Sequence, residues 1–221
     1  IIMTSDRKQV VKTYELGEYP PQTLSWNGIC DDGTVAQKGD YIFVMNGTDL
    51  AGNAGGGESN TLFTFDTTEA QLLLAVSDTA FSPDGNGVKD TLTFSPVTQT
   101  QDVVSYVFNI SDGTGKTVYT EKADRKLPLN FVWNGKDGDG ILCADGIYTA
   151  SLSVTAANGS SASATSASFE VDTVPPSAGV SVPWTAFSPD GDGNQDVIHL
   201  DVADCTSEKL WTAEVRNASD K

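Results

Sequence analysis

The chain of 221 residues carries 30 Asp and Glu against 13 Lys and Arg, which gives a formal net charge of −17 at pH 7. Such an excess of acid repels phosphate backbones and anionic lipid surfaces, so we expect no nucleic-acid partner and no direct membrane insertion of this segment. No apolar run approaches the roughly 20 residues that a membrane-spanning helix needs. The opening letters IIMTSDRKQV are typical of a strand and hairpin, so we interpret the sequence as a piece of a longer protein.

Residues 1–66 resemble a later stretch of the same chain. The segment LSWNG at 24–28 returns as FVWNG at 131–135, an offset of 107, and GDYIFVM from Gly39 resembles DGIYTASLSV from Asp145. IIMTSDRKQVVKT likewise aligns with FNISDGTGKTVYT. A period of this length suits a whole small domain better than a solenoid unit. We therefore predict that residues 1–66 are the C-terminal part of an immunoglobulin-like repeat.

Residues 67–172 contain a complete set of alternating strands. Apolar residues on every second position mark strands with one buried face, and the segments SDGTG, NGKDGDG, ADG and NGSS separate them as turns. About seven short strands in about 100 residues is typical of an immunoglobulin-like sandwich. The expected core positions are Leu92, Phe94, Val104, Tyr106, Phe108, Ile110, Leu129, Phe131, Trp133, Tyr148, Ala150, Leu152, Val154, Ala167, Phe169 and Val171.

Residues 173–221 begin a further copy. TAFSPDGNGVKD at 79–90 returns as TAFSPDGDGNQD at 185–196, an offset of 106, with nine of the twelve residues identical. The copy stops near NASDK, where NISDG stands in the middle repeat, so we predict the N-terminal part of a repeat here. The expected fold class is all-β: tandem immunoglobulin or fibronectin-III-like β-sandwiches, one complete and two partial.

Two motifs carry a resemblance to a known group. FSPDGNGVKDTLTF, FSPDGDGNQDVIHL and WNGKDGDGILCADGIYTASL resemble bacterial immunoglobulin-like tandem repeats, which are related to the immunoglobulin-like domain of flagellar hook-capping proteins and to gliding-motility C-terminal modules. GTDLAGNAGG and VDTVPP are similar to the last hairpin and the linker of bacterial surface repeats. The resemblance implies a scaffold or surface role without catalysis. GICDDGTVAQKGDY in the first repeat lacks the DGxY form, which leaves a different turn open there.

The two FSPDG loops have the oxygen spacing of a calcium site. Calcium takes about six to eight oxygen ligands, and the glycines of these loops permit a tight curl. We expect calcium chiefly at the second loop. The alternative is a Gly-Asp turn whose carboxylates cap backbone N–H groups. The candidate ligands are Asp84, Asn86 and Asp90 in the first loop, and Asp190, Asp192, Asn194 and Asp196 in the second.

Other conspicuous residues favour structural roles. Asp137, Asp139 and Asp145 are interpreted as part of a hairpin turn. Trp26 and Trp133 are equivalent in the repeat and are expected in the core, whereas Trp184 follows a linker and is expected at a domain junction. These roles involve no ligand.

Catalysis is not expected. Cys30, Cys143 and Cys205 fall in different repeats without a CxxC pair, so we expect free thiols. His199 is the single histidine, in the expected strand VIHLDV, and no nucleophile or phosphate-binding signature accompanies it. We therefore expect no enzyme, no catalytic residue and no cofactor other than calcium.

The resulting hypothesis is a non-enzymatic spacer or presentation module of a larger exported bacterial surface protein, located at the cell surface, in the periplasm or outside the cell. A ligand-binding module, either an adhesin or a carbohydrate binder, and a flagellar or motility component remain alternatives. The expected partners are neighbouring immunoglobulin-like repeats. The partial ends also predict head-to-tail self-association, because open apolar sheet faces are rarely left exposed. The alternative is that the ends are the limits of a fragment, or that each partial repeat is partly ordered alone. The predicted contact joins Leu200, Val202, Trp211 and Val215 of one chain to Ile2, Val11, Trp26 and Tyr41 of another.

Overall fold

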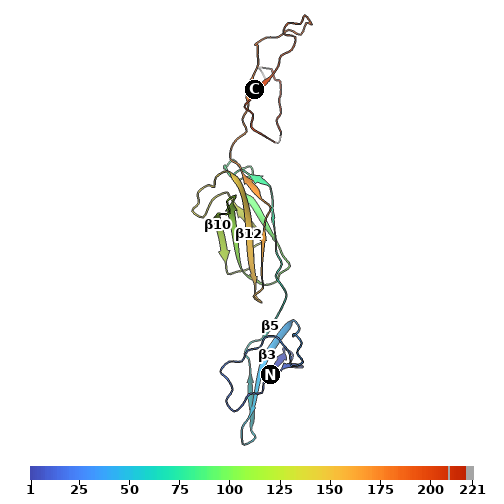
Figure 1. The fold of residues 1–221 in the computed structure, drawn as a ribbon, viewed down its shortest axis with the longest axis vertical. Helices are drawn as coiled ribbons and strands as arrows, with labels where there is room; N and C mark the ends of the chain where they lie inside the picture. The colour runs from blue at the N-terminus through green and yellow to red at the C-terminus, as the bar shows by residue number, and fades with distance from the viewer. Residues whose placement is uncertain (209, 218–221) are drawn as a thin grey trace. The chain divides into compact units, whose positions relative to one another are not determined.

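The computed structural model describes residues 1–208 and 210–217, and every helix or strand assigned within them is a β-strand (Figure 1). The chain separates into two compact units, Ile1–Val171 and the segment from Asp172 onward. The first unit contains two hydrophobic cores, one in each of its repeats. The expected all-β immunoglobulin-like class is confirmed. Within the described residues, no helix has the length and apolar character to cross a membrane.

The middle repeat is a two-layer β-sandwich. Its larger sheet has the order β10-β9-β12-β14-β7, with β13 also paired to β12, and its smaller sheet has the order β11-β8-β6. All pairs are antiparallel except β14 with β7, which joins the last strand of the repeat to one of its first. The strands are β6 (Leu73–Val76), β7 (Ala80–Phe81), β8 (Leu92–Val97), β9 (Val103–Asp112), β10 (Thr117–Ala123), β11 (Phe131–Trp133), β12 (Gly146–Ala156), β13 (Ser161–Thr165) and β14 (Phe169–Val171).

The core of the middle repeat lies between these two sheets. The predicted inward face of β12 is buried along its whole length, and so are most of the inward residues of β9. Aromatic rings bridge the layers: Phe108 of β9 stacks on Phe131 of β11 with ring centroids 4.4 Å apart. The buried set includes Leu92, Phe94, Tyr106, Phe108, Ile110, Phe131, Trp133, Tyr148, Ala150, Leu152, Val154, Phe169 and Val171.

Three residues predicted for this core are exposed instead. Val104 is turned outward because a bulge opposite Ala156 shifts the register of β9, and Val103 is buried in its place. Leu129 and Ala167 lie in the loops before β11 and β14, where the two-residue alternation of a strand does not apply. Leu129 is 90% exposed.

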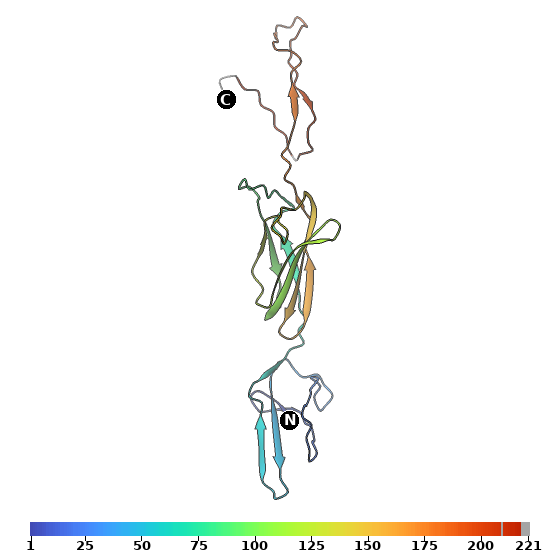
Figure 2. The same ribbon diagram turned by 90° about the vertical axis from the view of Figure 1, so that its left-hand side faces the viewer.

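Residues 1–66 form one sheet of five strands. Its order is β2-β1-β3-β4, with β5 also paired to β3, and the β3–β4 hairpin is the long pair at the blue end of Figure 2. The buried core is small and consists of Ile2, Val11, Ala36 and Tyr41. The strands are β1 (Ile2–Thr4), β2 (Val10–Lys12), β3 (Gly39–Thr48), β4 (Ala54–Glu58) and β5 (Phe63–Phe65).

This sheet repeats the larger sheet of the middle repeat with one change of register. Ile2 pairs with Phe43 as Ile110 pairs with Ala150, so β1 lies 108 residues before its counterpart. The sequence alignment placed it one residue differently, because the turn between β1 and β2 has one residue more than the turn between β9 and β10.

The segment from Asp172 contains two described strands, β15 (Gly179–Ser181) and β16 (Asp201–Ala203). They pair antiparallel, and Gly179 faces Ala203 just as Leu73 faces Val97. The register of the β6–β8 pair therefore returns 106 residues later. Lys209 and most of the aligned NASDK segment, 218–221, lie outside the described residues.

Candidate functional site

The first FSPDG loop is closed by its last aspartate. One carboxylate oxygen of Asp90 accepts a hydrogen bond from the backbone N–H of Gly85 at 2.8 Å, and the other accepts one from Gly87 at 2.7 Å. Both glycines have left-handed backbone angles, with φ of 82° and 87°, which other residues adopt only with strain. The loop is thus shaped by the pairing of its glycine N–H groups with one carboxylate.

The second loop has the same closure. Asp196 accepts hydrogen bonds from Gly191 at 2.8 Å and from Gly193 at 2.9 Å. The structure also brings carboxylate oxygens of Asp190, Asp192 and Asp196 within 4.8 Å of one another. An all-oxygen set of this kind has the chemistry that calcium prefers. Because Asp196 already accepts two backbone N–H groups, the cluster also has a structural role without an ion, and calcium binding stays a prediction.

The asparagines of the two loops bond to the acid two residues earlier. The side-chain amide of Asn86 donates to Asp84 at 2.9 Å, and that of Asn194 donates to Asp192 at 3.2 Å. The backbone N–H of Asn194 also donates to Asp192, and this bond lowers the pKa of the Asp192 carboxyl below its ordinary value. The structure places three of the seven predicted ligands in the first loop and four in the second.

A turn between tryptophan and tyrosine is the second structure shared by the repeats. Trp133 donates its indole N–H to a carbonyl of the following turn, and the Tyr148 hydroxyl donates to a carbonyl just before β12. Trp26 and Tyr41 make the same two bonds. The isolated bridge that closes the turn also recurs 107 residues later. The different turn left open for the first repeat is therefore not found.

Asp137 caps the backbone of the middle turn. Asp137 accepts hydrogen bonds from the N–H groups of Asp139 at 3.0 Å and of Ile141 at 2.9 Å. This is the hairpin-turn role expected for Asp137.

In the middle repeat the FSPDG motif packs onto the tryptophan turn. The ring centroid of Phe81 lies 5.5 Å from that of Trp133. Pro83 lies so close to Gly135 that a Cβ atom added there would be 2.5 Å from the proline Cγ. The motif thus covers the core, and Gly135 makes room for it.

In the first repeat the corresponding position is filled by a different residue. A Cβ added at Gly28 would lie 2.2 Å from the ring of Phe65, which belongs to β5. The Phe65 ring also packs at 5.6 Å from Trp26. Phe65 therefore takes the place over Gly28 that Pro83 takes over Gly135.

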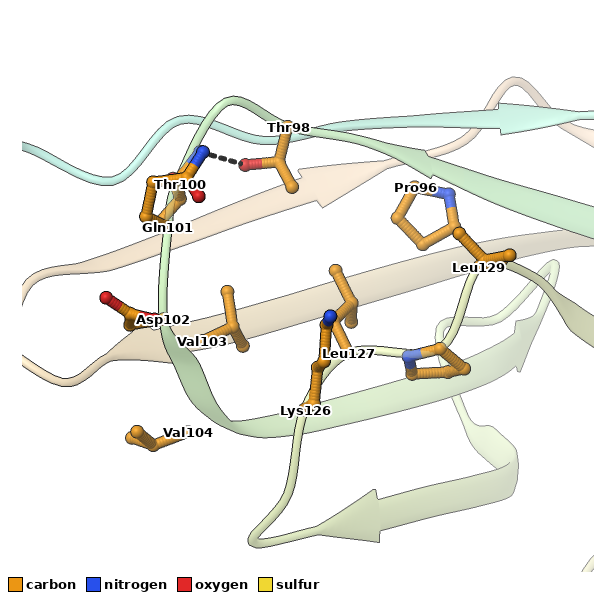
Figure 3. A pocket seen from close by; sticks show the side chains of 11 residues that line it. Pro96, Thr98, Thr100, Gln101, Asp102, Val103, Val104, Lys126, Leu127 and Leu129 are labelled. Atoms are coloured by element: carbon orange, nitrogen blue, oxygen red, sulfur yellow. Dashed lines mark hydrogen bonds between the residues drawn. The ribbon is translucent and has the colours of Figure 1, made fainter.

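A groove at one end of the middle sandwich was not predicted from the sequence. It has a volume of about 490 Å³ and lies between the end of β8, the start of β9 and the loop before β11. Figure 3 shows Pro96 and Leu129 at one side of it and Asp102 and Val104 at the other. Its lining residues come from two segments, 96–104 and 126–129, which lie apart in the sequence, so no local sequence pattern indicates the groove.

Two polar clusters were also missed. The buried Tyr106 donates its hydroxyl to Glu121 at 2.8 Å and accepts a hydrogen bond from Arg125 at 3.0 Å. The linker residue Asp66 forms an ion pair with Lys38 at 2.8 Å. This bond to Lys38, aided by Thr68, lowers the pKa of the Asp66 carboxyl to about 2.

The remaining singled-out residues show no reactive arrangement. Cys30, Cys143 and Cys205 are free thiols, as expected, and burial raises the pKa of the Cys143 thiol. His199 is exposed and precedes β16, so the strand predicted around it begins later. Trp184 is half-buried, and its place at a domain junction stays a prediction.

Comparison with known proteins was made for the whole chain. A family model described as the FlgD Ig-like domain matches residues 85–160, from the FSPDG loop to the turn after β12. No curated protein matches the chain.

Three solved structures share low identity with the chain. Dimeric latent PorU from Porphyromonas gingivalis is 18% identical over 62% of this chain and 12% of that chain, with a TM-score of 0.35. A tetra-tandem repeat in the extending region of a large adhesion protein is 17% identical over 91% and 53%, with a TM-score of 0.40. Pectate lyase Pel3 from Pectobacterium carotovorum is 14% identical over 50% and 30%, with a TM-score of 0.28. The chain thus spans about half or less of the length of each. The resemblance to the bacterial immunoglobulin-like repeats of the flagellar hook-capping group is confirmed by the family match, and residues 85–160 are similar to the FlgD Ig-like domain.

Proposed function

We propose that the chain is a non-enzymatic structural module of a larger exported bacterial protein, in which tandem sandwiches space or present another part. One observation carries the proposal: the repeated acidic motif serves the fold in the middle repeat. Its last carboxylate closes its own loop, and its Phe81 and Pro83 cover the tryptophan turn. A motif used in this way is explained without substrate or cofactor.

The linkers support a spacing role. Asp66 is held by Lys38 of the first repeat, and the side chain of Asn158 donates to the backbone carbonyls of Asp66 and Thr68. The turn in which Thr68 donates its N–H to Asp66 returns where Val174 donates to Asp172. A linker fastened by side chains limits the freedom of its chain, as a spacer requires.

The rival function is ligand binding in the groove of the middle repeat. Its volume of about 490 Å³ lies within the range of small-molecule sites, roughly 300 to 1,000 Å³. Leu129 and Val104 expose apolar surface there, as a carbohydrate or peptide platform does. A flagellar or motility role is suggested by the description of the matched family alone.

Binding of the full chain to a glycan array and to bacterial and host cells tests the proposal. We expect no saturable binding. The matched variants are Leu129→Asp in the groove and Ile141→Asp, an exposed residue on the turn after β11. Specific micromolar binding that Leu129→Asp removes and Ile141→Asp keeps would replace the spacer by the ligand-binding function.

A further inference from the structure

The linker between β5 and β6, residues 66–72, is held by one side chain of the middle repeat. Asn158 lies in the turn between β12 and β13. Its side-chain amide donates hydrogen bonds to the backbone carbonyl of Asp66 at 3.2 Å and to that of Thr68 at 2.9 Å. These acceptors lie 92 and 90 residues earlier in the chain. Asn158 therefore fastens the linker to a distant turn.

The other half of the Asn158 amide is fixed by its own turn. The side-chain oxygen accepts hydrogen bonds from the backbone N–H of Ser160 at 3.0 Å and from the Ser160 hydroxyl at 2.7 Å. A backbone N–H donates only to an acceptor, so this contact directs the oxygen to Ser160 and the nitrogen to the linker. A carboxylate in the same place would keep the contact with Ser160 and would set an oxygen against the two linker carbonyls.

The pair Asn158-Gly159 has the chemistry to make this change without an enzyme. The backbone nitrogen of Gly159 attacks the side-chain carbonyl carbon of Asn158, and the new C–N bond closes a cyclic imide. The amide nitrogen leaves as ammonia and takes the proton of the Gly159 nitrogen with it. Water then adds to either carbonyl of the ring and opens it to aspartate or isoaspartate. Glycine favours the ring closure, because it has no side chain to crowd the attacking nitrogen.

The fastened linker restrains this reaction. The backbone N–H of Gly159 donates to the carbonyl of Ala156 at 2.9 Å, and the Asn158 amide is bonded on both of its sides. Attack requires the Gly159 nitrogen to give up its hydrogen bond and the amide to turn toward it. The reaction therefore proceeds from the locally opened turn, in which the linker contact is broken.

We propose that Asn158 is a modification site that releases the linker: hydrolytic deamidation removes the donors that hold Asp66 and Thr68, and the new carboxylate prevents their return. Water does not reverse the reaction, so a linker released in this way stays released. The end of the linker remains attached, because Gln71 exchanges backbone hydrogen bonds with the hydroxyl of Thr100. The switch rests on the proposed spacer function, since a linker matters most where the spacing of repeats does.

Asn158→Asp in the full chain tests the release. The variant has the shape of the native side chain and keeps the oxygen that Ser160 bonds, but it lacks the N–H donors. Asn46→Asp is the control, because it adds the same charge at another exposed asparagine that precedes glycine, in β3. Hydrogen exchange is measured at the amide of Thr68, which donates to Asp66 at 2.9 Å. Asn158→Asp should accelerate it about fivefold, the factor that one net hydrogen bond supplies, and Asn46→Asp should leave it unchanged.

Peptide mass spectrometry of the wild-type chain in mildly alkaline buffer tests the modification. Aspartate and isoaspartate should form at Asn158, more slowly in the folded chain than in the same chain unfolded in urea. The modified molecules should show the fast Thr68 exchange of Asn158→Asp. Wild-type exchange in Asn158→Asp, or a folded chain that stays unmodified while the unfolded chain is converted, would overturn the proposal. Neither result involves ligand binding, so the spacer function stands or falls separately by the glycan and cell assays.

Discussion

The ring of Phe81 packs on that of Trp133, with centroids 5.5 Å apart, and this contact joins the start of the middle repeat to the turn that opens its second half. Phe81 is buried, and its strand β7 also pairs in parallel with β14. The equivalent Phe187 is 48% exposed. The phenylalanine of the repeated twelve-residue motif is therefore expected to stabilise the fold in the first copy and to contribute little in the second.

Replacing the two phenylalanines should show this difference. Phe81→Ala leaves a cavity beside Trp133 and should lower the free energy of unfolding of the middle repeat by about 3 to 5 kcal/mol. Phe187→Ala should change stability by less than about 0.5 kcal/mol, since little contact is lost. Urea unfolding followed by NMR signals of β12 measures both. Equal effects of the two substitutions would show that Phe81 does not cover the core.

Asp90→Ala should open the first FSPDG loop. The substitution leaves the N–H groups of Gly85 and Gly87 without their acceptor, which should cost about 1 to 2 kcal/mol of middle-repeat stability. Asp139→Ala, an exposed acid in another turn, is the control and should stay within about 0.5 kcal/mol of wild type. Thermal unfolding compares them. If Asp90→Ala behaves like Asp139→Ala, the carboxylate does not hold the loop.

The ion pair at the linker should be visible in a titration. The pKa of the Asp66 carboxyl is about 2, against an ordinary value of 3.8, because Lys38 bonds to the charged form. A depressed pKa in the folded state contributes stability above about pH 4 and loses it as the pH falls toward 2. NMR titration should show the Asp66 pKa rising toward 3.8 in Lys38→Ala.

Asp6 provides the internal control for that titration. Its carboxyl also has a pKa of about 2, but the leading cause is the hydroxyl of Thr4. Lys38→Ala should therefore leave the Asp6 pKa low. An Asp66 pKa near 3.8 in the wild-type chain would contradict the linker contact.

Calcium at the second loop is the remaining prediction. If Asp190, Asp192 and Asp196 bind the ion, millimolar calcium should raise the melting temperature of the wild-type chain, because a ligand of the folded state stabilises it. Asp192→Ala should abolish the shift, and Asp139→Ala should keep it. Identical melting curves in calcium and in chelator, with no heat in a calcium titration, would leave the loop as a turn held by its own hydrogen bonds.

The alternation of apolar and polar residues correctly predicted which side chains are buried in those strands of the middle repeat that contain no bulge. Every expected inward residue of β12 is buried, since nothing interrupts its two-residue period. Val104 was misplaced because a bulge adds a residue without changing the composition of the strand. Leu129 was misplaced because alternation does not mark where β11 begins.

The candidate sites were predictable only in part. The spacing of the loop acids can be read from the sequence. Whether the Asp90 carboxylate faces an ion or backbone N–H groups depends on the backbone angles of the loop glycines, which the sequence does not give. The groove near Leu129 and the ion pair of Lys38 with Asp66 join segments far apart in the chain, so no local pattern indicates them. Internal repetition was the strongest sequence signal for the fold, because it identifies equivalent residues in different repeats.

The measurement that tests the central claim most directly is hydrogen exchange at two matched amides. Ala150 and Phe43 hold equivalent places, each N–H bonding to a serine hydroxyl, Ser166 or Ser59. If the FSPDG motif completes a sandwich in the middle repeat alone, Ala150 should exchange far more slowly than Phe43, and introducing Phe81→Ala should accelerate only Ala150. Equal exchange at the two amides, or no response of Ala150 to Phe81→Ala, would contradict the account.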